Sequence, residues 1–107
     1  MNQERVKKLM EFLKNEPNDP FTIYALATEY LDESPSKSKD YFEILLTEHP
    51  EYLATYYHAA QLYADLDMIE EADATYQQGI TLAEKQNELK TLQELKNAYQ
   101  NFEFEYL

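Results

Sequence analysis

Two histidines and one acidic run are the side chains of this 107-residue chain that could carry catalytic or metal chemistry. His49 precedes Pro50, so we expect it to stand at a helix end, where the helix dipole favours a positive charge. His58 lies inside a predicted helix and has no acid or nucleophile at a meaningful spacing. An enzyme needs a nucleophile, a base and an orienting group together. The sequence shows no such combination, and we expect no catalytic residue.

The acidic run contains Asp65, Asp67, Glu70, Glu71 and Asp73 and has two interpretations. A calcium-binding EF-hand loop needs a glycine at its sixth position and a glutamate at its twelfth, and the run has neither. A helix start explains the run instead: Asp67 would cap the helix, and Glu70 three residues later would complete a capping box. We favour the helix cap and expect neither a metal nor a cofactor.

Composition excludes further classes of site. The chain has no cysteine, which removes disulfides, cysteine-ligated zinc, iron–sulfur clusters and thiol catalysis. Its single glycine cannot build a phosphate-binding loop. The net charge is −12, and residues 15–84 carry fifteen acidic and two basic side chains, which disfavours nucleic acid or an anionic membrane as partner. No apolar run approaches the ~18 residues of a membrane span, so we expect a cytoplasmic protein.

Helical periodicity dominates the chain. Val6, Leu9, Met10 and Leu13 form the stripe of an amphipathic helix over about 3–15, which must end before the next proline. Further helices are expected to start at Asp19-Pro20, at Ser34-Pro35, near Leu53, at Asp67 and near Glu88. The last six residues alternate like a strand, but they continue a helical stripe. We interpret them as the frayed end of the last helix.

An internal repeat organises these helices. Pro17 and Pro50 lie 33 residues apart, as do Leu9 and Phe42, and Phe42 lies 34 residues before Tyr76. The block Ile23-x2-Leu26-Ala27-x2-Tyr30 recurs as Tyr56-x2-Ala59-Ala60-x2-Tyr63, and Ala72-x3-Tyr76 and Gly79 follow. The chain thus resembles the tetratricopeptide repeat (TPR) family, whose period is near 34 and whose pattern is W-x2-L-G-x2-Y, A-x3-F, P.

The resemblance implies an all-α, right-handed helical-hairpin solenoid of about six helices. Its parts would be a half-repeat helix over about 3–15, repeats over about 20–50 and 53–86, and a capping helix over about 88–106, together one domain. Ser38 stands where the family usually has alanine, and Glu84 replaces the closing proline of the second repeat. Structural positions matching the repeat pattern are Leu26, Ala27, Tyr30, Phe42, Pro50, Tyr56, Ala59, Ala60, Tyr63, Ala72, Tyr76 and Gly79.

The resemblance also implies a non-enzymatic adapter that binds a peptide or helix of a partner protein in a concave groove formed by the first helix of each repeat. The positions expected to face this groove are Phe21, Tyr24, Thr28, Leu31, Tyr57, His58, Gln61 and Asp65, with Ala54 and Ala64 beside them. They include no lysine or arginine, so a clamp for a peptide carboxylate is not expected. The acidic charge favours a basic partner. Alternatively, Tyr24 and Tyr57 only cover neighbouring helices.

A self-associating module is the competing function. The two ends of the chain carry the apolar residues Val6, Met10, Phe102, Phe104 and Leu107. We expect these side chains to be exposed, and if the last helix caps the repeats imperfectly, this surface could form a symmetric homodimer.

Overall fold

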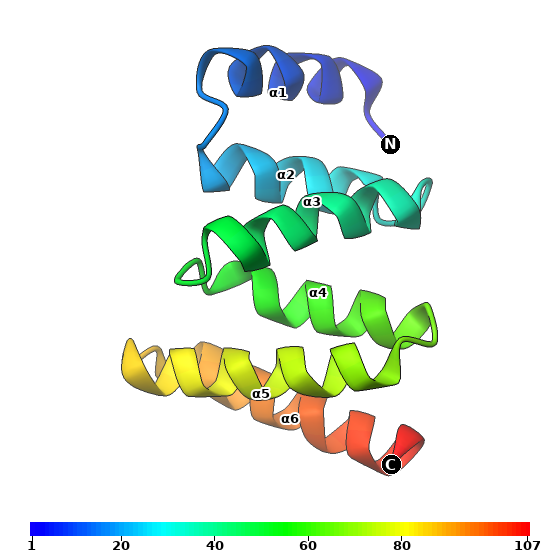
Figure 1. Cartoon of the computed structure of the whole chain (residues 1–107), viewed down its shortest axis with the longest axis vertical. Helices are drawn as coiled ribbons and strands as arrows, with labels where there is room; N and C mark the ends of the chain where they lie inside the picture. Colours follow the sequence, from blue (N-terminus) through cyan, green and yellow to red (C-terminus); the bar gives the residue numbers. More distant parts are fainter. The chain divides into compact units, whose positions relative to one another are not determined.

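The computed structural model describes residues 1–107 and contains six helices and no strand. They are α1 (Gln3–Asn15), α2 (Pro20–Tyr30), α3 (Pro35–Glu48), α4 (Ala54–Asp65), α5 (Ile69–Lys85) and α6 (Leu89–Tyr106). This confirms the all-α class. The chain divides into two compact units, Met1–Thr55 and Tyr56–Leu107. Figure 1 shows α2 and α3 packed side by side within the first unit, and α5 and α6 within the second.

In the first unit, α2 starts at the side-chain cap that the sequence predicts, whereas α3 starts at its predicted proline without a side-chain cap. The Asp19 carboxylate accepts hydrogen bonds from the Phe21 backbone N–H at 3.3 Å and from the Thr22 hydroxyl at 2.6 Å, and Pro20 occupies the first helical position of α2. Ser34 occupies the capping position before α3, but its hydroxyl makes no capping bond. The fixed φ of Pro35 is therefore the local signal that starts α3.

One part of the core of the first unit lies between α1 and α2. Leu9, Leu26 and Tyr30 are buried there, and Val6 and Leu13 pack against them from α1. Helix α1 thus buries one stripe, as its periodicity predicts, although Met10 of that stripe is exposed.

Ser38 is a polar residue inside this unit. Its side chain is fully buried, and its hydroxyl donates a 2.6 Å hydrogen bond to the backbone carbonyl of Ala27 on α2. The family usually has alanine here, and a serine is tolerated because its only polar group is satisfied. The bond also ties α3 to α2.

Asp67 does not cap α5, and that prediction is wrong. Asp67 has a φ of 62°, and α5 begins after Met68, which makes no side-chain capping bond. The Met68 N–H bonds to the carbonyl of Tyr63, and the Asp67 N–H bonds to that of Ala64. This pair of bonds is the Schellman motif, in which a residue in the left-handed region ends a helix. Asp67 therefore terminates α4.

The same turn ends α5. Asn87 has a φ of 57°, the Glu88 N–H bonds to the carbonyl of Ala83, and the Asn87 N–H bonds to that of Glu84. Aspartate and asparagine are the non-glycine residues that enter the left-handed region most readily. The second unit therefore turns twice without a glycine. Helix α5 continues to Lys85, as the absence of a proline at Glu84 predicts.

The one glycine of the chain lies where helices approach closely. A Cβ atom added to Gly79 on α5 would lie 2.6 Å from the Cβ of Tyr56 on α4 and 3.3 Å from a methyl carbon of Leu95 on α6. Both neighbours are buried. The repeat-pattern positions are buried throughout, except for Pro50, which lies in the turn after α3: Leu26, Ala27, Tyr30, Phe42, Tyr56, Ala59, Ala60, Tyr63, Ala72, Tyr76 and Gly79.

We predict that Gly79→Ala lowers the free energy of unfolding by about 1–2 kcal/mol, because overpacking against Tyr56 outweighs the gain in helix propensity. Thermal and urea unfolding followed by circular dichroism measure the change. Gln78→Ala is the matched control, because Gln78 is exposed on the same helix and should be neutral or slightly stabilising. A Gly79→Ala protein as stable as the wild type would show that the helices can move apart at no cost.

Candidate functional site

The side chains with potential for catalysis or metal binding are dispersed. No group of three His, Cys, Asp or Glu side chains is close enough to hold a metal ion. His49 follows the last residue of α3, and its Nδ1 lies 4.0 Å from the carboxylate of Glu51. His58 is half-buried, which lowers the pKa of its imidazole, and the edge of its ring faces Tyr57 at a centroid distance of 5.5 Å.

The predicted groove residues of the first unit have different surroundings. Phe21 is exposed, whereas the half-buried ring of Tyr24 lies 6.4 Å from that of Phe42 and 5.9 Å from that of Tyr52. The hydroxyl of Thr28 donates to the carbonyl of Ala25 in its own helix. Leu31 is half-buried at the end of α2. Among these predicted groove residues, Tyr24 is thus the one whose ring packs against other rings of its own unit.

A hollow of about 490 Å³ lies between α1 and the start of α2. Its lining residues are Asn2, Glu4, Arg5, Lys8, Leu9, Phe12 and Phe21. Phe21 is the only predicted groove residue among them, and Tyr24, Thr28 and Leu31 do not line this hollow.

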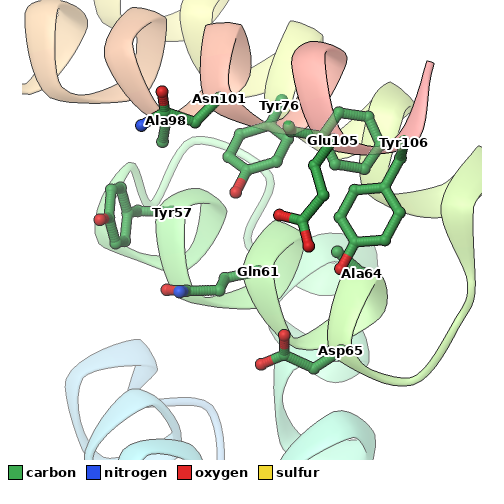
Figure 2. Close-up of a pocket in the computed structure, with 10 residues that line it drawn as sticks. Tyr57, Gln61, Ala64, Asp65, Tyr76, Ala98, Asn101, Glu105 and Tyr106 are labelled. Carbon is green, nitrogen blue, oxygen red and sulfur yellow. The ribbon is translucent and has the colours of Figure 1, made fainter.

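A second hollow, of about 160 Å³, lies in the second unit and contains three predicted groove residues. Tyr57, Gln61 and Asp65 line it from α4, together with Ala64 (Figure 2). Their spacing of three and four residues places them on one face of the helix. His58 does not line this hollow.

Helix α6 forms the other wall, which the sequence interpretation missed. Ala98, Asn101, Phe102, Glu105 and Tyr106 line the hollow from α6, and Tyr76 lines it from α5. Residues 98, 101 and 105 also follow the three-and-four spacing of one helix face. The sequence therefore contains this signal, but the repeat pattern implies only a capping role for the last helix.

Phe102 is buried, so the expectation that it is exposed at the chain end is wrong. Its ring lies 5.4 Å from that of Tyr76 on α5, and it also neighbours the rings of Tyr99 and Tyr106 on its own helix. These contacts place α6 against α5 and fix one wall of the hollow.

A hydrogen-bonded group also connects α5 with α6. The Tyr99 hydroxyl donates a 2.6 Å bond to the carboxylate of Asp73, and the Gln77 amide donates to the same carboxylate oxygen at 3.0 Å. These two bonds lower the pKa of Asp73, and the bond to Asp73 raises the pKa of Tyr99 to about 12. The Asp73 carboxylate therefore has a structural role, because it accepts hydrogen bonds that connect α5 with α6.

The hollow is acidic. Its two charged residues are Asp65 and Glu105, and no lysine, arginine or histidine lines it. Burial raises the pKa of Tyr76 to about 12, with further contributions from Tyr57, Asp65 and Tyr106. Figure 2 shows the Tyr76 hydroxyl, the Glu105 carboxylate and the Tyr106 ring directed into the space above α4. The arrangement offers aromatic surface and hydrogen-bond acceptors.

Comparison with known proteins identifies the family. No protein-family model matches the sequence, and no curated protein matches it. The solution NMR structure of a tetratricopeptide repeat domain protein from Salinibacter ruber is 43% identical to the chain, with a TM-score of 0.76 over 81% of this chain and 89% of that one. A crystal structure of a tetratricopeptide repeat domain protein from the same organism has the same identity and TM-score over 79% and 97% of the two chains.

The chain belongs to the tetratricopeptide repeat family. The helical-hairpin solenoid class and the TPR resemblance expected from the sequence are confirmed. The TPR fold indicates, in general terms, a protein-interaction module. None of the six helices combines the length and the apolar character required to cross a membrane.

We predict that Tyr99→Phe lowers the free energy of unfolding by about 1 kcal/mol at pH 7, because the hydrogen bond to Asp73 is lost. The folded-state pKa of Asp73 is lowered, so this stabilisation is present above its unfolded pKa of about 4 and is lost as the pH falls through the folded pKa. It is also lost as the pH rises from about 10 to about 12, where Tyr99 ionises.

Urea unfolding of both proteins at pH 7, pH 3 and pH 11 tests this pattern. A difference that is the same at pH 3 as at pH 7 would show that the Tyr99 hydroxyl does not act through ionised Asp73.

Proposed function

We propose that this TPR protein is a non-enzymatic adapter that binds a peptide or helix of a partner protein, and that the face shared by α4 and α6 is part of its binding groove. The observation that carries the proposal is the hollow of the second unit, in which Tyr57, Gln61 and Asp65 lie opposite residues of α6. Pockets of this kind with aromatic walls and a few polar groups hold side chains of partners.

Tyr57 is the residue best placed to contact a partner. Its side chain is 37% exposed, and its ring lines the hollow. A tyrosine supplies a large contact area at a modest cost in conformational entropy. The groove positions of the first unit, Phe21, Tyr24, Thr28 and Leu31, stay part of the proposal. The ring of Tyr24 packs against Phe42 and Tyr52, however, so substitution of Tyr24 is a poor test of binding.

The charge of the second unit supports a basic partner. Residues 56–107 carry ten acidic and three basic side chains. Such a surface attracts basic segments and repels nucleic acid and anionic membranes.

We expect Tyr57→Ala to weaken binding of partner peptides about thirtyfold, which corresponds to ~2 kcal/mol for a central aromatic contact. Peptides are first selected on the wild-type protein from a displayed random library, and their dissociation constants are then measured by fluorescence anisotropy. Leu66→Ala is the matched control, because Leu66 has the same 37% exposure and does not line the hollow. Circular dichroism checks that both variants remain helical.

Failure to select any peptide, or equal affinity of wild type and Tyr57→Ala for every selected peptide, would contradict this assignment of the groove.

Self-association through the terminal helices is the second candidate function. It is supported by the end of α6, where Phe104 is 95% exposed and Leu107 is 68% exposed. In the first unit, Phe12 and Phe21 also present exposed rings beside the basic residues Arg5 and Lys8. Exposed apolar groups of this size favour burial against a second copy.

If this second function operates, multi-angle light scattering at micromolar concentration should give the mass of a dimer for the wild type and of a monomer for Phe104→Ser. Thr81→Ala, at an exposed position on α5, is the control and should remain dimeric. A wild-type protein that is monomeric throughout this range would reject self-association.

A further inference from the structure

The hollow of the second unit has the composition of a site for a planar cation. Four aromatic rings line it, from Tyr57, Tyr76, Phe102 and Tyr106. The polar lining consists of two amides, Gln61 and Asn101, and two carboxylates. Aromatic faces and carboxylates both attract positive charge.

The two carboxylates of the hollow are not neutralised by the chain. Asp65 projects from α4 and Glu105 from α6, and both line the hollow. The ion pairs of the chain involve other residues, and neither carboxylate belongs to one. Both carboxylates are exposed to solvent, so a cation supplied by a partner can reach them.

The hydroxyl of Tyr76 is the independent sign of a ligand. Its side chain is only 5% exposed and packs on the rings of Tyr99 and Phe102, and its hydroxyl is directed into the hollow (Figure 2). No hydrogen bond to this hydroxyl is present in the structure. Burial, together with the nearby oxygens of Tyr57, Asp65 and Tyr106, raises its pKa. An N–H group of a ligand in the hollow can donate a hydrogen bond to this hydroxyl.

We propose that this hollow binds the guanidinium group of an arginine side chain from the partner protein. The planar guanidinium stacks on the tyrosine rings and donates hydrogen bonds to Asp65, Glu105 and the Tyr76 hydroxyl. The inference rests on the proposed function, since it names the side chain by which a docked peptide is held.

The size of the hollow fits one such side chain. Its volume is about 160 Å³, many times the roughly 10–15 Å³ that one water needs on the same measure. That space holds a long side chain but no turn of a helix. Arginine is favoured over lysine, because it has five N–H donors in one plane and stacks on aromatic faces, whereas an ammonium is a compact and strongly hydrated charge.

The test uses the full chain, labelled with ¹⁵N, and the blocked amino acid N-acetyl-arginine amide as probe. We expect saturable shifts of the backbone signals of Tyr57, Gln61 and Asn101 at millimolar concentration. The citrulline analogue, which has the same shape without the charge, should bind at least tenfold more weakly, and the lysine analogue several-fold more weakly. Equal binding of arginine and either analogue, or shifts centred outside the hollow, would overturn the proposal.

Charge-neutral variants separate a local site from general attraction to an acidic protein. Glu105→Gln and Asp65→Asn should each weaken binding of N-acetyl-arginine amide about tenfold. Glu94→Gln is the matched control, because it removes one charge from the same helix at an exposed position that does not line the hollow. A loss in Glu94→Gln as large as that in Glu105→Gln would refute the site.

The selected peptides described above distinguish this inference from the adapter function itself. If their binding depends on Tyr57 but they contain no arginine that contributes to affinity, the adapter function stands and the arginine site is refuted. If N-acetyl-arginine amide binds in the hollow as expected but no peptide is selected, the arginine site stands and the adapter function is refuted.

Discussion

Close approach of helices at positions with small side chains is the constraint on which this structure depends. At Gly79, α5 contacts both Tyr56 on α4 and Leu95 on α6. The absence of a side chain at this one position therefore permits two close contacts between helices. Ser38 serves a comparable purpose in the first unit, where its small side chain is fully buried and its hydroxyl bonds to the backbone of α2. Packing at interior density leaves little room for a larger group at either place.

The turns between helices use few special residues. Prolines start α2 and α3, and Asp67 and Asn87 end α4 and α5 in the left-handed region. This explains how a chain with a single glycine forms six helices: residues other than glycine supply the turns, and the glycine is used for packing.

The candidate site is a consequence of the same packing. Tyr76, Tyr99 and Phe102 join α5 to α6, and the bond from Tyr99 to Asp73 adds a polar link between the two helices. Because α6 is held in this way, Asn101 and Glu105 come to line the same hollow as Tyr57, Gln61 and Asp65. One wall of the hollow and part of the core are thus built from adjacent stripes of one helix, and Phe102 belongs to both.

The tertiary structure places the aspartates of the acidic run in three different environments. In the sequence, Asp65, Asp67 and Asp73 belong to one acidic run, which we interpret as the start of a helix. In the structure, Asp67 ends a helix, Asp73 accepts the Tyr99 bond, and Asp65 lines the hollow. Neighbours in the chain therefore have three different functions, because a helix and a turn direct successive residues to different sides.

The sequence by itself determined the helices, their approximate ends and the TPR family, because apolar periodicity, prolines and the repeated block are local or evenly spaced signals. It also indicated Tyr57, Gln61 and Asp65 as one face of a helix, by their spacing. Only the tertiary structure decided that Phe102 is buried, that Asp67 closes a helix and that α6 supplies Glu105 to the hollow. These outcomes depend on contacts between residues distant in sequence, such as Tyr76 with Phe102, and on backbone bonds that no single residue type specifies.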